Sequence, residues 1–106
     1  MENVKLVVLY PQPLDKAQFE RDYVLHLDMF QQALSIPKTD ELPYTVTKFV
    51  AVGDEIPKYY QMFSMFFSSM NALQKTLTSK EMQTVASDAV RISSGGAPSI
   101  LIGIDG

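Results

Sequence analysis

The pattern of apolar residues predicts a strand at each end of the chain. Residues 4–10 are almost continuously apolar and rich in valine and leucine, which is typical of a strand buried on both faces. Pro11 and Pro13 end this strand because proline cannot donate to a sheet ladder. Residues 100–104 form a similar apolar run after a glycine- and proline-containing turn at residues 94–98, so they predict the last strand.

A hairpin is predicted in the middle of the chain. Residues 44–52 and 59–67 each alternate in the manner of a strand, and Gly53 and Asp54 lie between them at a turn. The preceding residues, 36–43, contain two prolines around a polar stretch and predict a surface loop.

A long helix is predicted over residues 15–35, with Asp15 as its cap. Its apolar stripe repeats at intervals of three or four residues, so the stripe lies on one face of the helix. The stripe consists of Phe19, Tyr23, His26, Phe30 and Leu34.

Two shorter helices are predicted between the third and fourth strands. Ser68 or Ser69 caps the first, and the sequence 78–81 fits a capping box for the second, in which Thr78 is the cap and Glu81 reaches back to it. The apolar face of the second consists of Met82, Val85, Ala86 and Ala89.

The resulting order of elements predicts one α+β domain over residues 1–106, with a ferredoxin-like βαββαβ fold and a four-stranded antiparallel sheet. In this topology both crossovers lie on one side of the sheet, so the other side should meet water. Here the strands carry apolar residues on both faces: the third alternates Tyr59, Phe63, Met65 and Phe67 against Tyr60, Met62 and Phe66. We therefore expect a homodimer, sheet against sheet, as a dimeric α+β barrel.

The amino-acid composition excludes several kinds of site and partner. The chain has no cysteine and one histidine, so thiolate chemistry and multi-histidine metal cages are excluded. A net charge of −3 without any basic cluster argues against a nucleic-acid partner. No apolar run approaches the length of a membrane span or a signal peptide, so we expect a cytoplasmic protein with no membrane partner.

Several segments resemble the EthD family of small dimeric α+β barrel proteins, named for a component of ethyl tert-butyl ether degradation. The resemblance begins with the sequence of residues 5–11 followed by the aromatic-x-x-His segment of residues 19–26. It continues through residues 67–73 to Asp88, then Gly95-Gly96 and residues 101–103. The chain departs from the family where Leu27-Asp28-Met29 replaces x-Pro-Leu, where Ile92 replaces an aromatic residue, and in a longer loop at residues 36–43.

His26 is the principal candidate for chemistry. It lies in the apolar helix stripe, and the resemblance places the family's histidine at the same position. An imidazole there would exchange a proton with a ligand bound between helix and sheet, with Tyr23 as its neighbour. The alternative is a half-buried structural histidine bonded to Tyr23 or to a backbone carbonyl.

Other residues around this candidate allow both functional and structural interpretations. Aromatic side chains that would bind a hydrophobic substrate are Tyr10, Phe30, Tyr59 and Tyr60, although tyrosines also suit a core or a dimer interface. Asp22, four residues before His26, could reach the imidazole edge. Asp88 matches an acidic position of the family, and its simpler interpretation is a helix-end or loop anchor.

Cofactors and metals are not predicted. Gly95-Gly96 lacks the helix and lysine of a phosphate loop and is more simply a turn. Some other barrels of this class bind haem, for which His26 would be the axial ligand, but no further residue supports it.

Two functional hypotheses remain. The first is a cofactor-free enzyme of catabolism, a lyase, isomerase or oxygenase with His26 as its acid–base, that acts on a hydrophobic or aromatic metabolite. The second is a non-catalytic dimer that binds a small molecule or serves only as an accessory to such a pathway.

Overall fold

The computed structural model describes residues 3–36 and 43–105, and its elements follow the predicted order. They are β1 (Val4–Pro11), α1 (Lys16–Ala33), β2 (Tyr44–Lys48), β3 (Tyr59–Phe67), α2 (Met70–Leu77), α3 (Lys80–Ile92) and β4 (Ser99–Ile104). The strands form a four-stranded antiparallel sheet in the order β2-β3-β1-β4. The ferredoxin-like α+β fold predicted from the sequence is confirmed.

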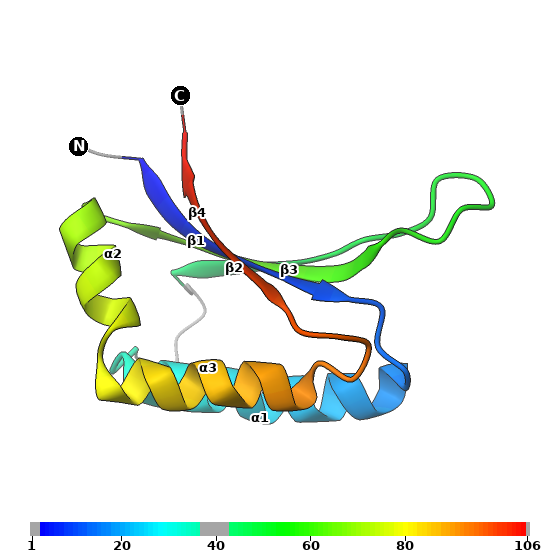
Figure 1. Cartoon of the computed structure of the whole chain (residues 1–106), viewed down its shortest axis with the longest axis horizontal. Coiled ribbons are helices and arrows are strands. Elements are labelled where there is room, and N and C mark those ends of the chain that lie inside the picture. The colour runs from blue at the N-terminus through cyan, green and yellow to red at the C-terminus, as the bar shows by residue number, and fades with distance from the viewer. Residues whose placement is uncertain (1–2, 37–42, 106) are drawn as a thin grey trace.

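The helices cover one face of the sheet. Figure 1 shows α1 and α3 side by side beneath the strands, with α2 connecting the end of β3 to this helical layer. Alternate residues of β1, including Val4, Leu6 and Tyr10, point into the space between the layers and are buried. The core therefore lies between the sheet and the helices, where any internal site must be built.

Helix α1 forms as the stripe predicts. The side chain of Asp15 accepts a hydrogen bond from the amide of Gln18 and so caps the first turn. The stripe turns toward the sheet, and its members Phe19, Tyr23, His26 and Phe30 are buried. Because residues at these intervals share one face, the helix delivers its only imidazole to the interior.

The second strand is shorter than its sequence pattern. Pairing with β3 ends at Lys48, although a strand was predicted to residue 52. The chain beyond it leaves the sheet as a projecting loop that turns at Gly53, whose φ of +70° favours glycine. The valines of this loop, Val50 and Val52, are 81% and 90% exposed, so apolar alternation alone overestimated the strand. The predicted loop at 36–43 lies almost wholly outside the described residues.

The cap of α3 also differs from prediction. Ser79, not Thr78, is the cap, and its hydroxyl accepts from the amide of Met82. Glu81 is then one residue too early to close a capping box. The Thr78 hydroxyl instead donates to the carbonyl of Gln74 at the end of α2. Helix α2 begins after Ser69, one of the two predicted caps.

A register shift at the end of β1 changes the side on which Tyr60 lies. Tyr10 pairs with Gln61 and Pro11 with Tyr59, which leaves Tyr60 as an additional residue on β3. Such a bulge redirects a side chain. The Tyr60 hydroxyl donates to Glu20 of α1, so the prediction that Tyr60 shares a face with Met62 and Phe66 is wrong.

The face of the sheet away from the helices carries both apolar and polar residues. The register places Val7 and Leu9 of β1 beside Met62 of β3 and Leu101 of β4, with Phe66 56% exposed at the same face. Lys5 lies over the Phe66 ring and pairs with Asp105. The open face is thus apolar at its centre.

The turn before β4 requires a glycine because of a close approach. A Cβ added at Gly95 would lie 1.8 Å from the carbonyl oxygen of Gln12. This segment also holds Ser94, whose hydroxyl accepts from the amide of Leu14. Gly95-Gly96 is therefore part of the structural contact between the β4 turn and the β1–α1 connection.

Candidate functional site

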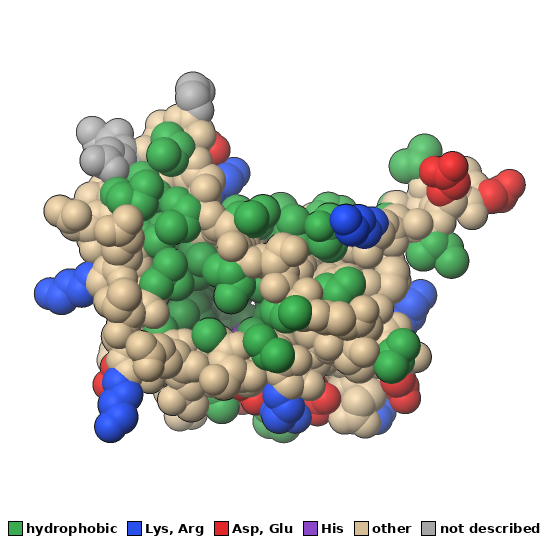
Figure 2. Space-filling view, viewed as in Figure 1, with side chains coloured by type: hydrophobic (Ala, Val, Ile, Leu, Met, Phe, Trp, Pro, Cys, Tyr) green, Lys and Arg blue, Asp and Glu red, His purple; other side chains and the backbone are tan. Residues whose placement is uncertain are grey.

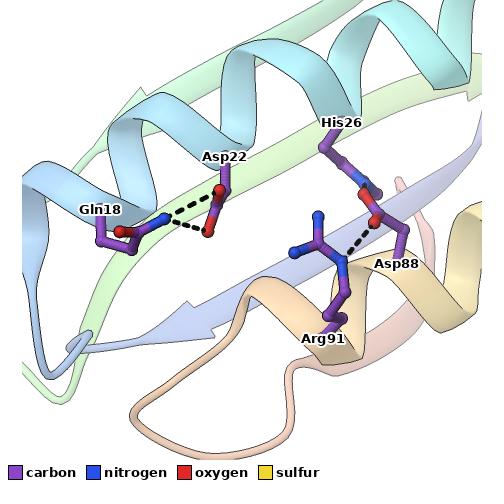
Figure 3. A network of polar contacts seen from close by, with 5 residues as sticks. All are labelled: Gln18, Asp22, His26, Asp88 and Arg91. Carbon is purple, nitrogen blue, oxygen red and sulfur yellow. Dashed lines mark hydrogen bonds and ion pairs between the residues drawn. The ribbon is translucent and has the colours of Figure 1, made fainter.

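His26 pairs with a carboxylate from the neighbouring helix. Its Nδ1 atom lies 2.8 Å from Oδ2 of Asp88 on α3, and the two side chains are 7% and 11% exposed. Figure 3 shows the imidazole reaching from α1 toward Asp88. Adjacent packing of α1 and α3 thus joins two residues that are 62 positions apart in the sequence.

Asp88 is itself held by a cation. Its second oxygen, Oδ1, accepts a hydrogen bond of 2.8 Å from Nε of Arg91, one turn later on α3. The Arg91 side chain is 59% exposed, so its charge lies at the surface. The carboxylate considered from the sequence, Asp22, accepts from Gln18 instead (Figure 3). Asp88 is therefore more than a helix-end anchor, because it also bonds the imidazole of His26.

The protonation states follow from these contacts. Burial lowers the pKa of His26 below its usual value and outweighs the opposing effect of Asp88. Burial acts to raise the pKa of Asp88, but hydrogen bonds from His26 and Arg91 hold it below its usual range. An ionised carboxylate only accepts hydrogen bonds, so the neutral imidazole carries its proton on Nδ1. Nε2 is left unprotonated, as a base.

A cavity lies beside His26, between the sheet and the helices. Its volume is about 60 Å³, below the roughly 300–1,000 Å³ of ordinary ligand pockets. Figure 2 shows a hollow surrounded by apolar side chains between the sheet and the helical layer. His26 is on the cavity wall, and its Nε2 forms no hydrogen bond with any residue that the structure describes.

The wall of the cavity is apolar apart from His26 and Tyr10. The remaining side chains come from the sheet and all three helices. They are Leu6, Val8, Leu27, Phe30, Phe63, Leu77, Met82, Val85, Ala86, Ala89 and Ile100. None of these residues is charged, so the cavity offers no partner for an anionic ligand group.

The predicted aromatic residues divide into two groups. Tyr10 and Phe30 line the cavity with His26. Tyr23 packs against the imidazole, with ring centroids 5.7 Å apart, but does not line the cavity. Burial raises the pKa of Tyr23 against the opposing effect of the nearby Gln61 side chain, but the buried hydroxyl makes no hydrogen bond of normal geometry with the described residues. Tyr59 and Tyr60 also lie outside the cavity.

Tyr60 belongs to a separate polar cluster. Its hydroxyl and the Lys48 ammonium both donate to Glu20, and Lys48 also donates to Gln61. The hydrogen bond to Glu20, together with partial burial, raises the pKa of Tyr60 to about 12. This cluster ties α1 to β2 and β3, so a structural role accounts for it.

Residues 3–36 and 43–105 contain no group of three histidine, cysteine, aspartate or glutamate residues placed to hold a metal ion. None of their helices has the length and apolar character needed to cross a membrane.

Similarity to proteins of known structure agrees with the sequence resemblance. An EthD family protein from Bacillus halodurans is 28% identical, with 100% of each chain covered and a TM-score of 0.79. The EthD resemblance found in the sequence is thereby confirmed over the whole chain. No protein-family model matches the chain, and neither does any curated protein.

More distant structures share the fold alone. A dimeric ferredoxin-like protein of unknown function from Jannaschia is 13% identical, covering 94% of this chain and 97% of that one, with a TM-score of 0.65. SnoaB, a cofactor-independent oxygenase from Streptomyces nogalater, is 12% identical, covering 100% and 93%, with a TM-score of 0.56.

Proposed function

We propose that this chain, which resembles an EthD family protein over its full length, binds a small apolar molecule in the cavity and that His26 removes a proton from it. The observation that carries the proposal is the arrangement of the imidazole. One nitrogen bonds a buried carboxylate, the other forms no hydrogen bond within the described residues, and the imidazole lines the cavity. A buried histidine needs a hydrogen-bond partner in any role, so it is the unbonded second nitrogen beside a cavity that favours chemistry over a purely structural role.

The chemistry is general-base catalysis. Nε2 of His26 takes a proton from an acidic C–H or O–H of the ligand, and the electron pair remains on the ligand as an enolate or phenolate. Asp88 stabilises the imidazolium that forms, and Arg91 keeps Asp88 ionised and oriented. Tyr10 is the other polar side chain on the wall, and burial raises its pKa, so it stays a hydroxyl that donates to the developing oxyanion.

The ligand enters the cavity without charge. An apolar wall with no cation cannot compensate the desolvation of a carboxylate or phosphate. The negative charge of Asp88, directly behind His26, adds repulsion. We therefore propose an enolisable ketone or a phenol rather than an acid as the ligand class.

A homodimer is part of this proposal. The apolar centre of the open sheet face, with Phe66 56% exposed, is the surface that a second copy would cover. The related fold of a dimeric ferredoxin-like protein supports the same assembly.

A second candidate function is favoured by the size of the cavity. At about 60 Å³, it is smaller than the order of 300 Å³ that a catalytic site for a small organic molecule needs. In this case the chain is a non-catalytic binding or accessory dimer. A substrate is accommodated under the first proposal only if part of it lies outside the cavity or if the apolar wall moves.

One experiment separates the two candidates. Acetophenone in D₂O exchanges its methyl protons when a base removes them, and its binding shifts the imidazole signals of the single histidine in NMR spectra. We expect binding, with exchange at least about 100-fold faster for the wild type than for His26→Gln. Binding without accelerated exchange would support the accessory function, and the absence of both would refute ligand binding at His26.

A further inference from the structure

We propose that residues 50–56, here called the arm, dock on β4 of a second copy of this chain and complete the border of the His26 cavity. The inference rests on the dimer proposed above but not on the chemistry of His26. The partner subunit would then supply a part of the cavity wall that one chain leaves open.

The arm projects from the sheet with apolar side chains in water. Figure 1 shows it extending beyond the sheet between β2 and β3, and Figure 2 shows apolar side chains on both of its sides. Val50, Val52 and Ile56 are 81%, 90% and 77% exposed. Its first residues continue the alternation of β2, and Val52 pairs with Glu55 across the turn of the arm itself, but no named strand lies beside these residues within the described chain. Such an exposed apolar edge is a template on which a strand of another chain can pair.

The β4 strand likewise has an exposed edge with no strand beside it in the described residues. It is an edge strand whose neighbour within the described residues is β1. Ile100, Ile102 and Ile104 are 47%, 43% and 70% exposed, and the strand contains no charge and no proline. Natural edge strands are normally protected by lysine, proline or a bulge, which β4 lacks.

The positions of the two features exclude docking within one chain. The arm extends from β2 and β3 at one side of the sheet, whereas β4 forms the opposite edge, beyond β1. An arm therefore reaches a β4 strand only in another molecule. Under two-fold symmetry the contact occurs twice, so two facing sheets would be closed at both edges, as in a barrel.

The surface area is adequate for a second copy. A valine, leucine or isoleucine side chain has about 100 Å² of apolar surface. At the observed exposures, these six arm and β4 side chains expose about 800 Å² in two copies together. With the open sheet face, which adds Phe66, this passes the roughly 1,000 Å² expected of a specific interface. Asp54 and Glu55 at the tip of the arm disfavour an anionic membrane as the alternative occupant.

The contact would reach the candidate site through Ile100. This side chain lines the His26 cavity and is also half exposed on β4. An arm docked over it places Val50 or Val52 of the partner subunit at the mouth of the cavity. The partner would then extend the apolar wall beyond the small volume that one chain encloses.

The absence of cysteine from the chain makes the contact directly testable. Val52→Cys and Ile102→Cys proteins are mixed, unfolded and refolded together, and treated with a short bismaleimide that tolerates small differences in register. The control replaces Val52→Cys with Val24→Cys, a site on α1 that is 63% exposed. We expect about tenfold more cross-linked heterodimer from the arm pair, because docking raises the effective concentration of its thiols.

Sedimentation of the same refolded samples distinguishes the possible failures. A dimer in which the arm and control pairs cross-link equally would overturn the arm contact and leave the dimer standing. A monomer would overturn both. Val50→Asp combined with Val52→Asp provides a second check: we expect a folded chain by circular dichroism with at least about tenfold weaker dimerisation. Unchanged dimerisation of this variant would contradict the inference.

Discussion

The His26 and Asp88 side chains are both largely buried, although Asp88 carries a charge. Arg91, which is hydrogen-bonded to Asp88, stabilises that charge. Burial alone favours a neutral imidazole, whereas Asp88 favours the imidazolium. The positive charge of Arg91 lowers the pKa of His26 and keeps Asp88 ionised. The pair is therefore a neutral base next to a fixed carboxylate, able to accept one proton.

Substitutions of the two partners should move the pKa of His26 in opposite directions. Asp88→Asn removes the charge that raises it, so the NMR titration midpoint should fall. Arg91→Gln removes a charge that lowers it, so the midpoint should rise. Shifts in the same direction for both variants would contradict the assigned electrostatics. With one histidine in the chain, the titrating signal is unambiguous.

The buried histidine also makes a definite contribution to the pH dependence of stability. Its pKa is lower in the folded state than the ordinary 6.5, so the unfolded chain binds more protons as pH falls through 6.5. The free energy of unfolding should therefore decrease below pH 6.5 and recover above it. His26→Gln should lack this contribution. The free energy of unfolding, measured by urea denaturation at paired pH values, should therefore change less with pH in the variant than in wild type.

At the scale of elements, single hydroxyls determine where helices begin. The Ser79 hydroxyl caps α3, whereas that of Thr78 bonds the end of α2. Ser79→Ala should cost about 1 kcal/mol of stability. Thr78→Ala is the matched control and should cost less, as measured by urea denaturation. A larger loss at Thr78 would restore the capping box predicted from the sequence.

Replacement of glycine by alanine should destabilise the protein to different extents at Gly53 and at Gly95. At Gly95 a methyl group would collide with the Gln12 carbonyl, and backbone cannot move aside cheaply. At Gly53 nothing lies within 4 Å, and the φ of +70° is the sole obstacle. We expect Gly53→Ala to cost about 1 kcal/mol and Gly95→Ala to lower the melting temperature further. Equal melting temperatures would contradict the close approach.

Local patterns predicted the elements well but could not show their mutual placement. The bounds of β3 and the buried stripe of α1 follow from side-chain periodicity, which the chain itself contains. The extra residue at Tyr60 was not predictable, because a bulge depends on the register of a neighbouring strand. The His26–Asp88 bond was equally hidden, since it depends on the packing of α1 against α3. The acidic position of the EthD resemblance was the only signal for Asp88, and Arg91 had none.

At the scale of the whole molecule, an apolar sheet face, an exposed arm and an unprotected edge occur in one small chain. Met62→Asp would place a charge opposite Leu9 at the apolar centre of the open face, away from Lys5, where partner burial would leave it without compensation. We expect this variant to sediment as a monomer of 11.9 kDa and the wild type as a dimer. A monomeric wild type at micromolar concentration would refute the proposed assembly.

Deuterium exchange into acetophenone, followed across pH, reports whether His26 is the base of this site. The His26 imidazole is titrated by NMR in the same samples. We expect the exchange rate to rise with the fraction of neutral imidazole, with one shared midpoint below 6.5. The shared midpoint should also shift downward in Asp88→Asn. A rate that ignores the His26 titration, or that is unchanged in His26→Gln, would contradict the claim.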